Sequence, residues 1–161
     1  MPLVAAVLAM ALAACGAGGQ GSQSSSPRQA VTGPVASCAR PSPIGEAPGG
    51  GGPEVLGHGT GAQLRGLIMA SPFPLVAGPR DVKVVWRMTG SGPLKLAAYD
   101  SDGRRIALAW GPEPHGGSTY RRPGEEWGSG YRFRRPGCYR LTARRTEGRG
   151  EAWLRVGPPS H

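Results

Sequence analysis

Apolar and polar residues alternate in several short runs in the second half of the chain, a spacing typical of strands with one buried face. In the clearest run, Val82, Val84, Trp86 and Met88 fall on one face of residues 81–89. No window of a dozen residues repeats apolar positions at helical spacing. The pattern predicts strands at 63–70, 81–89, 94–100, 104–110, 130–134, 138–146 and 151–156. About seven short strands without helices predict an all-β fold, an antiparallel β-sandwich.

The run at 138–146 has a phase that separates inward from outward side chains. Tyr139, Leu141 and Ala143 share one face, which we expect to lie in the core. The other face then carries Cys138, Arg140, Thr142 and Arg144. A bulge near Gly137 would reverse this phase. Two segments rich in Gly and acidic residues, at 100–103 and 147–150, are expected to be turns.

The chain begins with an apolar run that ends in Leu12-Ala13-Ala14-Cys15. This sequence matches the lipobox of bacterial lipoproteins, in which a signal peptidase cuts before a cysteine that carries lipid. The run is shorter than the roughly 20 residues that cross a bilayer as a helix. We therefore predict a signal peptide at 1–14, a lipid on Cys15 and a location at the extracytoplasmic face of the cell membrane. Because no Lys or Arg precedes the run, either translation starts upstream or the signal is weak.

Residues 15–61 are dominated by Gly, Ser, Gln, Pro and Ala, and all four tryptophans follow them. Such a composition lacks the apolar residues that offset chain entropy, so we expect a flexible lipidated tether. The predicted domain is then residues 62–158, and we expect it to be a monomer. So small a core gives only marginal stability, so we also expect a covalent cross-link. Met69 and Met88 fall at strand positions and are expected to pack in this core.

Cysteine usage supplies a candidate cross-link. Apart from Cys15 the chain holds only Cys38 and Cys138, and disulfides persist outside the cytoplasm. We expect these two residues to pair, and because Cys138 points away from the core, the bond would hold the Cys38 segment against the outside of the domain. The alternative is two free thiols.

Several of these motifs resemble a group of uncharacterised secreted bacterial lipoproteins. The resemblance rests on Arg135-Pro-Gly-Cys-Tyr-Arg-Leu-Thr142, on the prolines after Cys38, on Val84-Val-Trp86 and on residues 123–130, and it covers roughly residues 38–157. In that group an immunoglobulin-like sandwich ends with a Pro-Gly-Cys-Trp or Pro-Gly-Cys-Tyr strand and one final strand. The resemblance implies fold, export and the cysteine pair, and it implies no activity.

The formal net charge is +9, and all but two of the 19 basic residues are arginine. If Phe133 and Leu141 point inward on neighbouring strands, one outward face carries four arginines: Arg132, Arg134, Arg140 and Arg144. The partners available outside the membrane are anionic lipid headgroups or acidic wall polymers, and nucleic acid is excluded by location. The alternative is an arginine-rich surface that is merely solvated.

Residues 111–130 are predicted to form a long loop, and loops of more than about 12 to 15 residues are often functional. This loop carries four residues of types that anchor interfaces: Tyr120, Arg121, Arg122 and Trp127. The alternative is that Trp127 packs into the core and the arginines pair with Glu125 and Glu126.

Residue types that support catalysis are sparse, and the three histidines lie far apart in sequence. We assign no catalytic residue, no cofactor and no metal ligand. The leading hypothesis is a lipid-anchored, non-enzymatic binding or structural module of the cell envelope. The alternative is a module that binds carbohydrate or an anionic wall polymer, and an enzyme or metal carrier ranks third.

Overall fold

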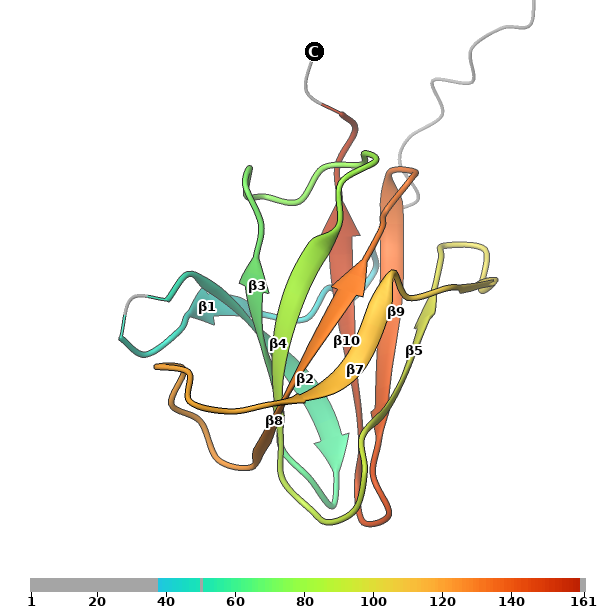
Figure 1. The fold of residues 1–161 in the computed structure, drawn as a ribbon. Helices are drawn as coiled ribbons and strands as arrows, with labels where there is room; N and C mark the ends of the chain where they lie inside the picture. The colour runs from blue at the N-terminus through green and yellow to red at the C-terminus, as the bar shows by residue number, and fades with distance from the viewer. Residues whose placement is uncertain (1–37, 50, 160–161) are drawn as a thin grey trace, which may run out of the picture. The chain divides into compact units, whose positions relative to one another are not determined.

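The computed structural model describes residues 38–49 and 51–159, and in these residues every regular element is a strand (Figure 1). The strands are β1 (Ile44–Glu46), β2 (Pro53–Thr60), β3 (Leu64–Met69), β4 (Val82–Met88), β5 (Lys95–Tyr99), β6 (Arg105–Ile106), β7 (Trp110–His115), β8 (Glu125–Tyr131), β9 (Gly137–Arg144) and β10 (Arg149–Val156). All strand pairs are antiparallel. The predicted all-β class is therefore confirmed. The predicted signal peptide, Cys15 and residues 16–37 lie outside the described residues.

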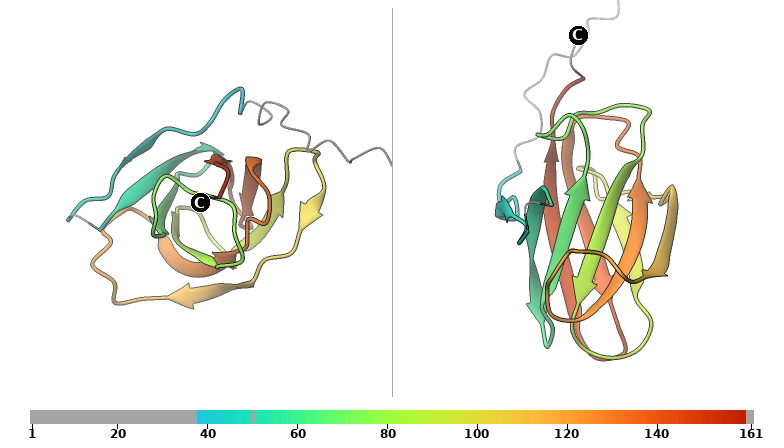
Figure 2. Two further views of the ribbon diagram at one scale, coloured as in Figure 1. Left: turned by 90° about the horizontal axis from the view of Figure 1, so that it is seen from above. Right: turned by 60° about the vertical axis from the view of Figure 1, so that its left-hand side comes forward.

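The strands form one sheet in the order β6-β5-β9-β10-β2-β3-β4-β8-β7, and β1 pairs with β2 beside this path. The sheet curls so that its two halves face each other across the core, as the view from above shows (Figure 2). Strand β2 belongs to both halves, because Glu54–Gly57 pair with β3 while His58–Thr60 pair with β10. The result is sandwich-like, with β2 as the shared edge.

The core lies between the two halves of the sheet, and the side chains that point into it from β4 and β9 are the ones that the alternation predicted. On β4, Val84, Trp86 and Met88 are fully buried, and on β9 the inward residues are Tyr139, Leu141 and Ala143. The Trp86 indole N–H donates to the hydroxyl oxygens of Ser129 (3.0 Å) and Tyr131 (3.1 Å), so its polar atom is satisfied inside the core. Met88 is core as expected, whereas Met69 is half exposed at the end of β3.

The predicted boundary between tether and domain at residues 61 and 62 is wrong. Strands β1 and β2 lie within the segment assigned to the tether, so the fold includes residues 44–49 and 51–60. The glycines of β2 serve close packing here, because a Cβ on Gly59 would stand 1.9 Å from the Ala62 carbonyl oxygen. Composition alone cannot separate glycines that loosen a chain from glycines that let strands approach closely.

The predicted long loop at 111–130 is also wrong. It contains most of β7 and most of β8, and only residues 116–124 connect them. The expected strands at 104–110 and 130–134 are correspondingly shortened or displaced. Strand β8 carries Gly128-Ser-Gly130, and a Cβ on Gly130 would stand 2.1 Å from the Trp110 indole nitrogen. Trp110 of β7 therefore covers this stretch, which looks like a flexible loop in sequence.

Cys38 and Cys138 form a disulfide, as predicted, with their Cα atoms 5.0 Å apart. The bond lies on the outward side of β9, apart from the main core. The segment that follows Cys38 continues along β10: Ser42 donates its N–H to the Trp153 carbonyl oxygen (2.9 Å), and the Trp153 N–H donates to the Ser42 hydroxyl (2.9 Å). The predicted attachment to the outside of the domain is confirmed.

Candidate binding groove

The residues that the sequence placed on a binding loop are mainly structural. Tyr120 is buried, and its hydroxyl donates to the Glu54 carboxylate of β2 (2.6 Å). The Arg122 guanidinium donates to both oxygens of the same carboxylate (2.8 and 2.6 Å). The alternative pairing of the loop arginines with Glu125 and Glu126 is therefore wrong for Arg122. Of the four proposed binding residues only Arg121 is exposed.

Trp127 is buried in the main core, as the alternative interpretation stated. The Arg145 guanidinium lies over its ring, 4.6 Å from the centroid. Arg145 is itself buried and donates to the carbonyl oxygens of Gly92 (2.7 Å) and Met88 (3.0 Å). This pair ties the end of β9 to the β4–β5 connection, a contact between segments too distant in sequence for local patterns to predict.

The 116–124 connection covers a second, smaller core on the outer face of β3 and β4. This cluster consists of Ala47, Leu67, Val85 and Tyr120. Glu54 stands beside Tyr120, and Glu126 closes the start of β8 through hydrogen bonds from Ser118 (2.6 Å) and Arg87 (2.9 Å) and a short contact with His115. Two buried carboxylates thus hold the connection against the sheet.

Both carboxylates titrate abnormally. Burial by itself would raise the pKa of Glu54, but hydrogen bonds from Arg122 and Tyr120 outweigh it, so the pKa lies below its ordinary value of 4.5. For Glu126, burial again acts upward, and hydrogen bonds from Ser118 and His115 together with the charge of Arg87 bring the pKa below 4.5. Burial and Glu54 raise the pKa of Tyr120, so its hydroxyl remains a donor.

These shifts predict acid sensitivity. A carboxylate with a lower pKa in the folded protein contributes stability that is full above the unfolded-state pKa and is lost as pH falls through the folded-state value. The free energy of unfolding should therefore fall as the pH is lowered below 4.5. Urea titrations from pH 7 to pH 3 would measure it, and Glu126→Gln should flatten part of the pH dependence. Equal midpoints across that range would contradict the assignment.

The predicted single face of four arginines does not form. Arg132 and Arg134 follow β8, Arg140 and Arg144 lie on β9, and these two strands are not neighbours in the sheet. Phe133 and Leu141 do point inward as expected. The prediction required the strands that carry Phe133 and Leu141 to be neighbours. It failed because β8 pairs with β4 and β7 and not with β9.

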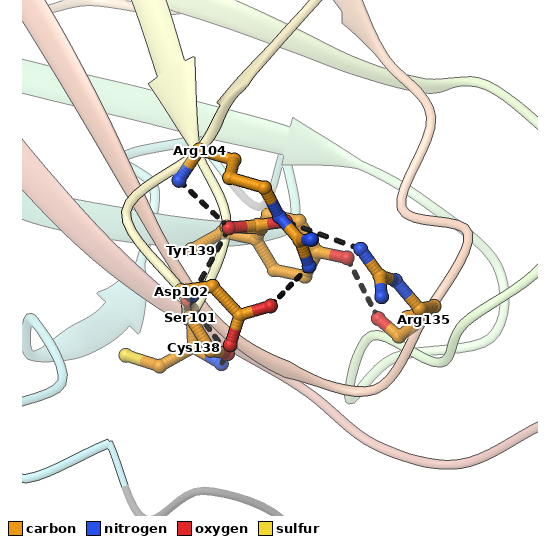
Figure 3. A network of polar contacts seen from close by, with 7 residues as sticks. Ser101, Asp102, Arg104, Arg135, Cys138 and Tyr139 are labelled. Carbon is orange, nitrogen blue, oxygen red and sulfur yellow. Dashed lines mark hydrogen bonds and ion pairs between the residues drawn. The ribbon is translucent and has the colours of Figure 1, made fainter. Parts of the chain in front are cut away.

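Arg104 and Arg135 take part in a structural network around the Asp100 turn (Figure 3). Asp100 accepts the backbone N–H groups of Asp102 (3.0 Å) and Arg104 (2.9 Å), which fixes the predicted turn. Arg135 approaches the same carboxylate at 3.3 Å, and Ser101 binds the Cys138 backbone N–H at 2.8 Å. The turn thus holds the strand end that carries the disulfide.

A groove of about 420 Å³ lies on the outer face of β2, β10, β9 and β5. Along one side runs an aromatic row, in which Arg140 of β9 is in register with Tyr99 of β5 and Trp153 of β10. Arg140 and Tyr99 line the groove, and Trp153 extends the row beyond it on β10. The Arg140 guanidinium lies 4.6 Å from the Tyr99 centroid and 5.8 Å from the Trp153 centroid. Held between two rings, the guanidinium keeps edge donors for a ligand and has little rotamer freedom left to lose.

The other side of the groove is a cationic row. Arg144 of β9 is in register with Lys95 of β5 and with Arg149 of β10, and Arg149 is in register with Thr60 of β2. Arg144 and Arg149 line the groove, and Lys95 extends the row beyond it on β5. All three cations are exposed, and among the described residues none of them lies within ion-pair distance of a carboxylate. Like charges directly opposite one another destabilise a sheet.

The two rows are separated by four residues along each strand, or about 14 Å at strand spacing. Between them lie Ala97, Thr142 and Glu151 in register. Glu151 accepts the Trp153 indole N–H (3.2 Å) and stands 3.9 Å from Arg140, so part of its charge is neutralised. The groove is therefore net cationic, with a low floor at Thr142.

Sequence analysis found two members of this groove, Arg140 and Arg144, from strand phase alone. It missed Arg149 and Tyr99, which line the groove, and Lys95 and Trp153, which extend its two rows through cross-strand register. The turn at 147–150 carried a usable signal, because a tight hairpin there places Arg149 opposite Arg144. No comparable local signal placed Lys95 or Tyr99.

Comparison with known proteins gave no match: no family model, curated sequence or solved structure is similar to this chain at a significant level. Within residues 38–49 and 51–159, no three residues of the His, Cys, Asp and Glu types gather to hold a metal ion. The same part of the chain contains no helix with the length and apolarity needed to cross a bilayer.

Proposed function

We propose that this protein is a lipid-anchored, non-enzymatic module of the cell envelope that binds an anionic polymer in the groove on β2, β10, β9 and β5. The observation that carries the proposal is the row Lys95, Arg144 and Arg149, three exposed cations in register without an acidic partner in the row. A bound polyanion would relieve their mutual repulsion and release its own counterions. The lipid on Cys15 would keep the groove close to the envelope.

Arg140 supports the same ligand class. Its guanidinium is already held between Tyr99 and Trp153, so a phosphate or carboxylate would meet a preorganised planar donor. A ligand that reaches Arg140 and the cationic row together must span about 14 Å along the strands, which requires a polymer or oligomer.

A second candidate is a neutral carbohydrate, which the partly exposed rings of Tyr99 and Trp153 favour. In that case the aromatic row would carry the binding and the cationic row would contribute little. The two candidates differ in their dependence on charge.

The test is a titration of the full chain, purified in a neutral detergent, with polyphosphate, polygalacturonate and neutral dextran. We expect both polyanions to bind, more weakly as salt increases, and dextran not to bind. Arg144→Gln with Arg149→Gln should lower the polyanion affinity roughly thirtyfold, since each cation at an anionic surface is worth ~1 kcal/mol. Arg121→Gln with Arg134→Gln removes the same charge from exposed sites outside the groove and is the matched control. If both double variants lose the same affinity for the polyanions, binding depends only on net charge and the groove is not the binding site.

The cationic row also predicts a gain in stability when it is broken. Without ligand, Arg144→Gln should raise the free energy of unfolding by about 0.2 to 1 kcal/mol, because it removes repulsion from Lys95 and Arg149. Chemical denaturation at low salt would measure the change, and Arg121→Gln should leave stability unchanged. A loss of stability in Arg144→Gln would contradict the proposed strain in the row.

A further inference from the structure

The exposed large apolar side chains of the described residues gather at one end of the fold. Ile44, Met69 and Phe73 are 44%, 50% and 40% exposed. Phe73 and Ile44 border a hollow of about 210 Å³ that Leu75 also lines. Met69 borders a second hollow of about 360 Å³, which reaches the same Leu75. We call the surface formed by Ile44, Met69 and Phe73 the apolar end.

The described chain starts at this same end. Cys38 is bonded to Cys138, and Cys138 is in register with Arg155 near the end of β10. The β3–β4 connection that carries Phe73 joins β10 there, through the pairing of Val76 with Gly157. Figure 1 shows the end of β10, the start of β9 and the β3–β4 connection together at the top of the view. The segment that leads from Cys15 therefore enters the fold beside the apolar end.

Cationic side chains surround these apolar ones. Arg40 follows Cys38, Arg155 lines the smaller hollow and Arg80 lines the larger one, and all three are exposed. Asp81 beside Arg80 is paired with Arg132 at 2.7 Å, so the apolar end retains a positive charge. Exposed apolar groups within a cationic rim fit the boundary between acyl chains and anionic headgroups.

We propose that the apolar end docks on the lipid surface, with Phe73 and Met69 inserted at the headgroup boundary. The inference rests on the proposed lipid anchor at Cys15, which lies 23 residues before Cys38 in sequence. A chain of that length reaches at most ~80 Å, so the anchor keeps the apolar end within reach of the membrane. Docking of the apolar end would be weak on its own, but the anchor raises the effective concentration of the apolar end at the membrane.

Docking at this end leaves the cationic row of the groove free. The cationic row lies at the opposite end of β9 and β10, because Arg149 begins β10 and Arg155 lies six residues further along it. That separation is about 20 Å along the strand. A docked domain would thus direct the cationic row away from the bilayer.

The experiment places a reporter at the apolar end of the full lipidated chain, reconstituted into vesicles of phosphatidylcholine and phosphatidylglycerol. Phe73→Trp carries the reporter, and its emission is taken as the difference from the wild-type protein in the same vesicles. We expect lipids brominated near the headgroup to quench this emission. Arg121→Trp, on the 116–124 connection, is the matched reporter away from the apolar end and should not be quenched. Adding Met69→Asp to Phe73→Trp should reduce the docked fraction roughly tenfold and abolish the quenching.

The outcomes separate the docking from the anchor. If the protein floats with the vesicles but neither reporter is quenched, or both are quenched equally, the docking is overturned while the anchor stands. If the protein does not float with the vesicles, the anchor itself is absent and the inference falls with it. Quenching at position 73 that persists with Met69→Asp also overturns it, because insertion would then not depend on the apolar end.

Discussion

Replacing both Cys38 and Cys138 by serine is expected to lower the free energy of unfolding by about 4 kcal/mol, the largest effect of any substitution considered. The bond closes a loop across a sequence separation of 100 residues, so its loss frees a long stretch of the unfolded chain. The folded state also loses a contact, because the segment after Cys38 is held on the sheet by this bond and by the hydrogen bond between Ser42 and Trp153 of β10. A domain of this size has little stability in reserve.

Guanidinium chloride unfolding of the full chain in detergent measures the change. The internal control is reduction: dithiothreitol should destabilise the wild-type protein by a similar amount and leave the double serine variant unaffected. If the two proteins unfold at the same denaturant concentration under oxidising conditions, the disulfide makes no contribution and the argument fails.

The second large effect is expected at Glu54. Glu54→Ala should lower the free energy of unfolding by about 3 kcal/mol, because it leaves the Tyr120 hydroxyl buried without its acceptor and Arg122 without its carboxylate. Arg122 is partly exposed and can turn toward water, which keeps the loss below that of a fully buried pair. The same substitution should loosen the 116–124 connection, since Tyr120 closes the small core beneath it.

Denaturant unfolding and amide hydrogen exchange over residues 116–124 would test this prediction together. Arg121→Ala is the matched control, because Arg121 stands between Tyr120 and Arg122 but is exposed. Glu54→Gln retains the shape and one acceptor and should cost less than Glu54→Ala. Exchange rates that stay at wild-type values in Glu54→Ala would show that the carboxylate does not hold the connection.

Local pattern was sufficient for the fold class and for several strands. The alternation at Val84, Trp86 and Met88 needs only the period of a strand, and the inward face of β9 follows from the same period. The disulfide also required no tertiary information, because only two cysteines remain after Cys15 is set aside. These features depend on neighbouring residues or on residue type alone.

The candidate site depended on features that are not local. Arg144, Arg149 and Lys95 form a row only because β10 and β5 pair with opposite edges of β9. The expected face of Arg132, Arg134, Arg140 and Arg144 failed for the same reason, since strand phase states which side a residue faces and not which strand lies beside it. Without the pairing, an outward arginine cannot be assigned to a surface.

The boundaries of the domain show the same limit. Residues 44–60 have the glycine and proline content of a linker, yet Gly59 lies where the Ala62 carbonyl leaves no room for a Cβ. Tyr120 and Trp127 are residue types common at interfaces, and the fold buries both, one against Glu54 and the other beneath Arg145. The sequence by itself determined the all-β class and the apolar faces of strands such as β4 and β9, because both depend on residues next to one another. Only the tertiary structure decided which glycines are packed, which aromatic residues are covered and which cations share a groove, because each of these depends on contacts between distant segments.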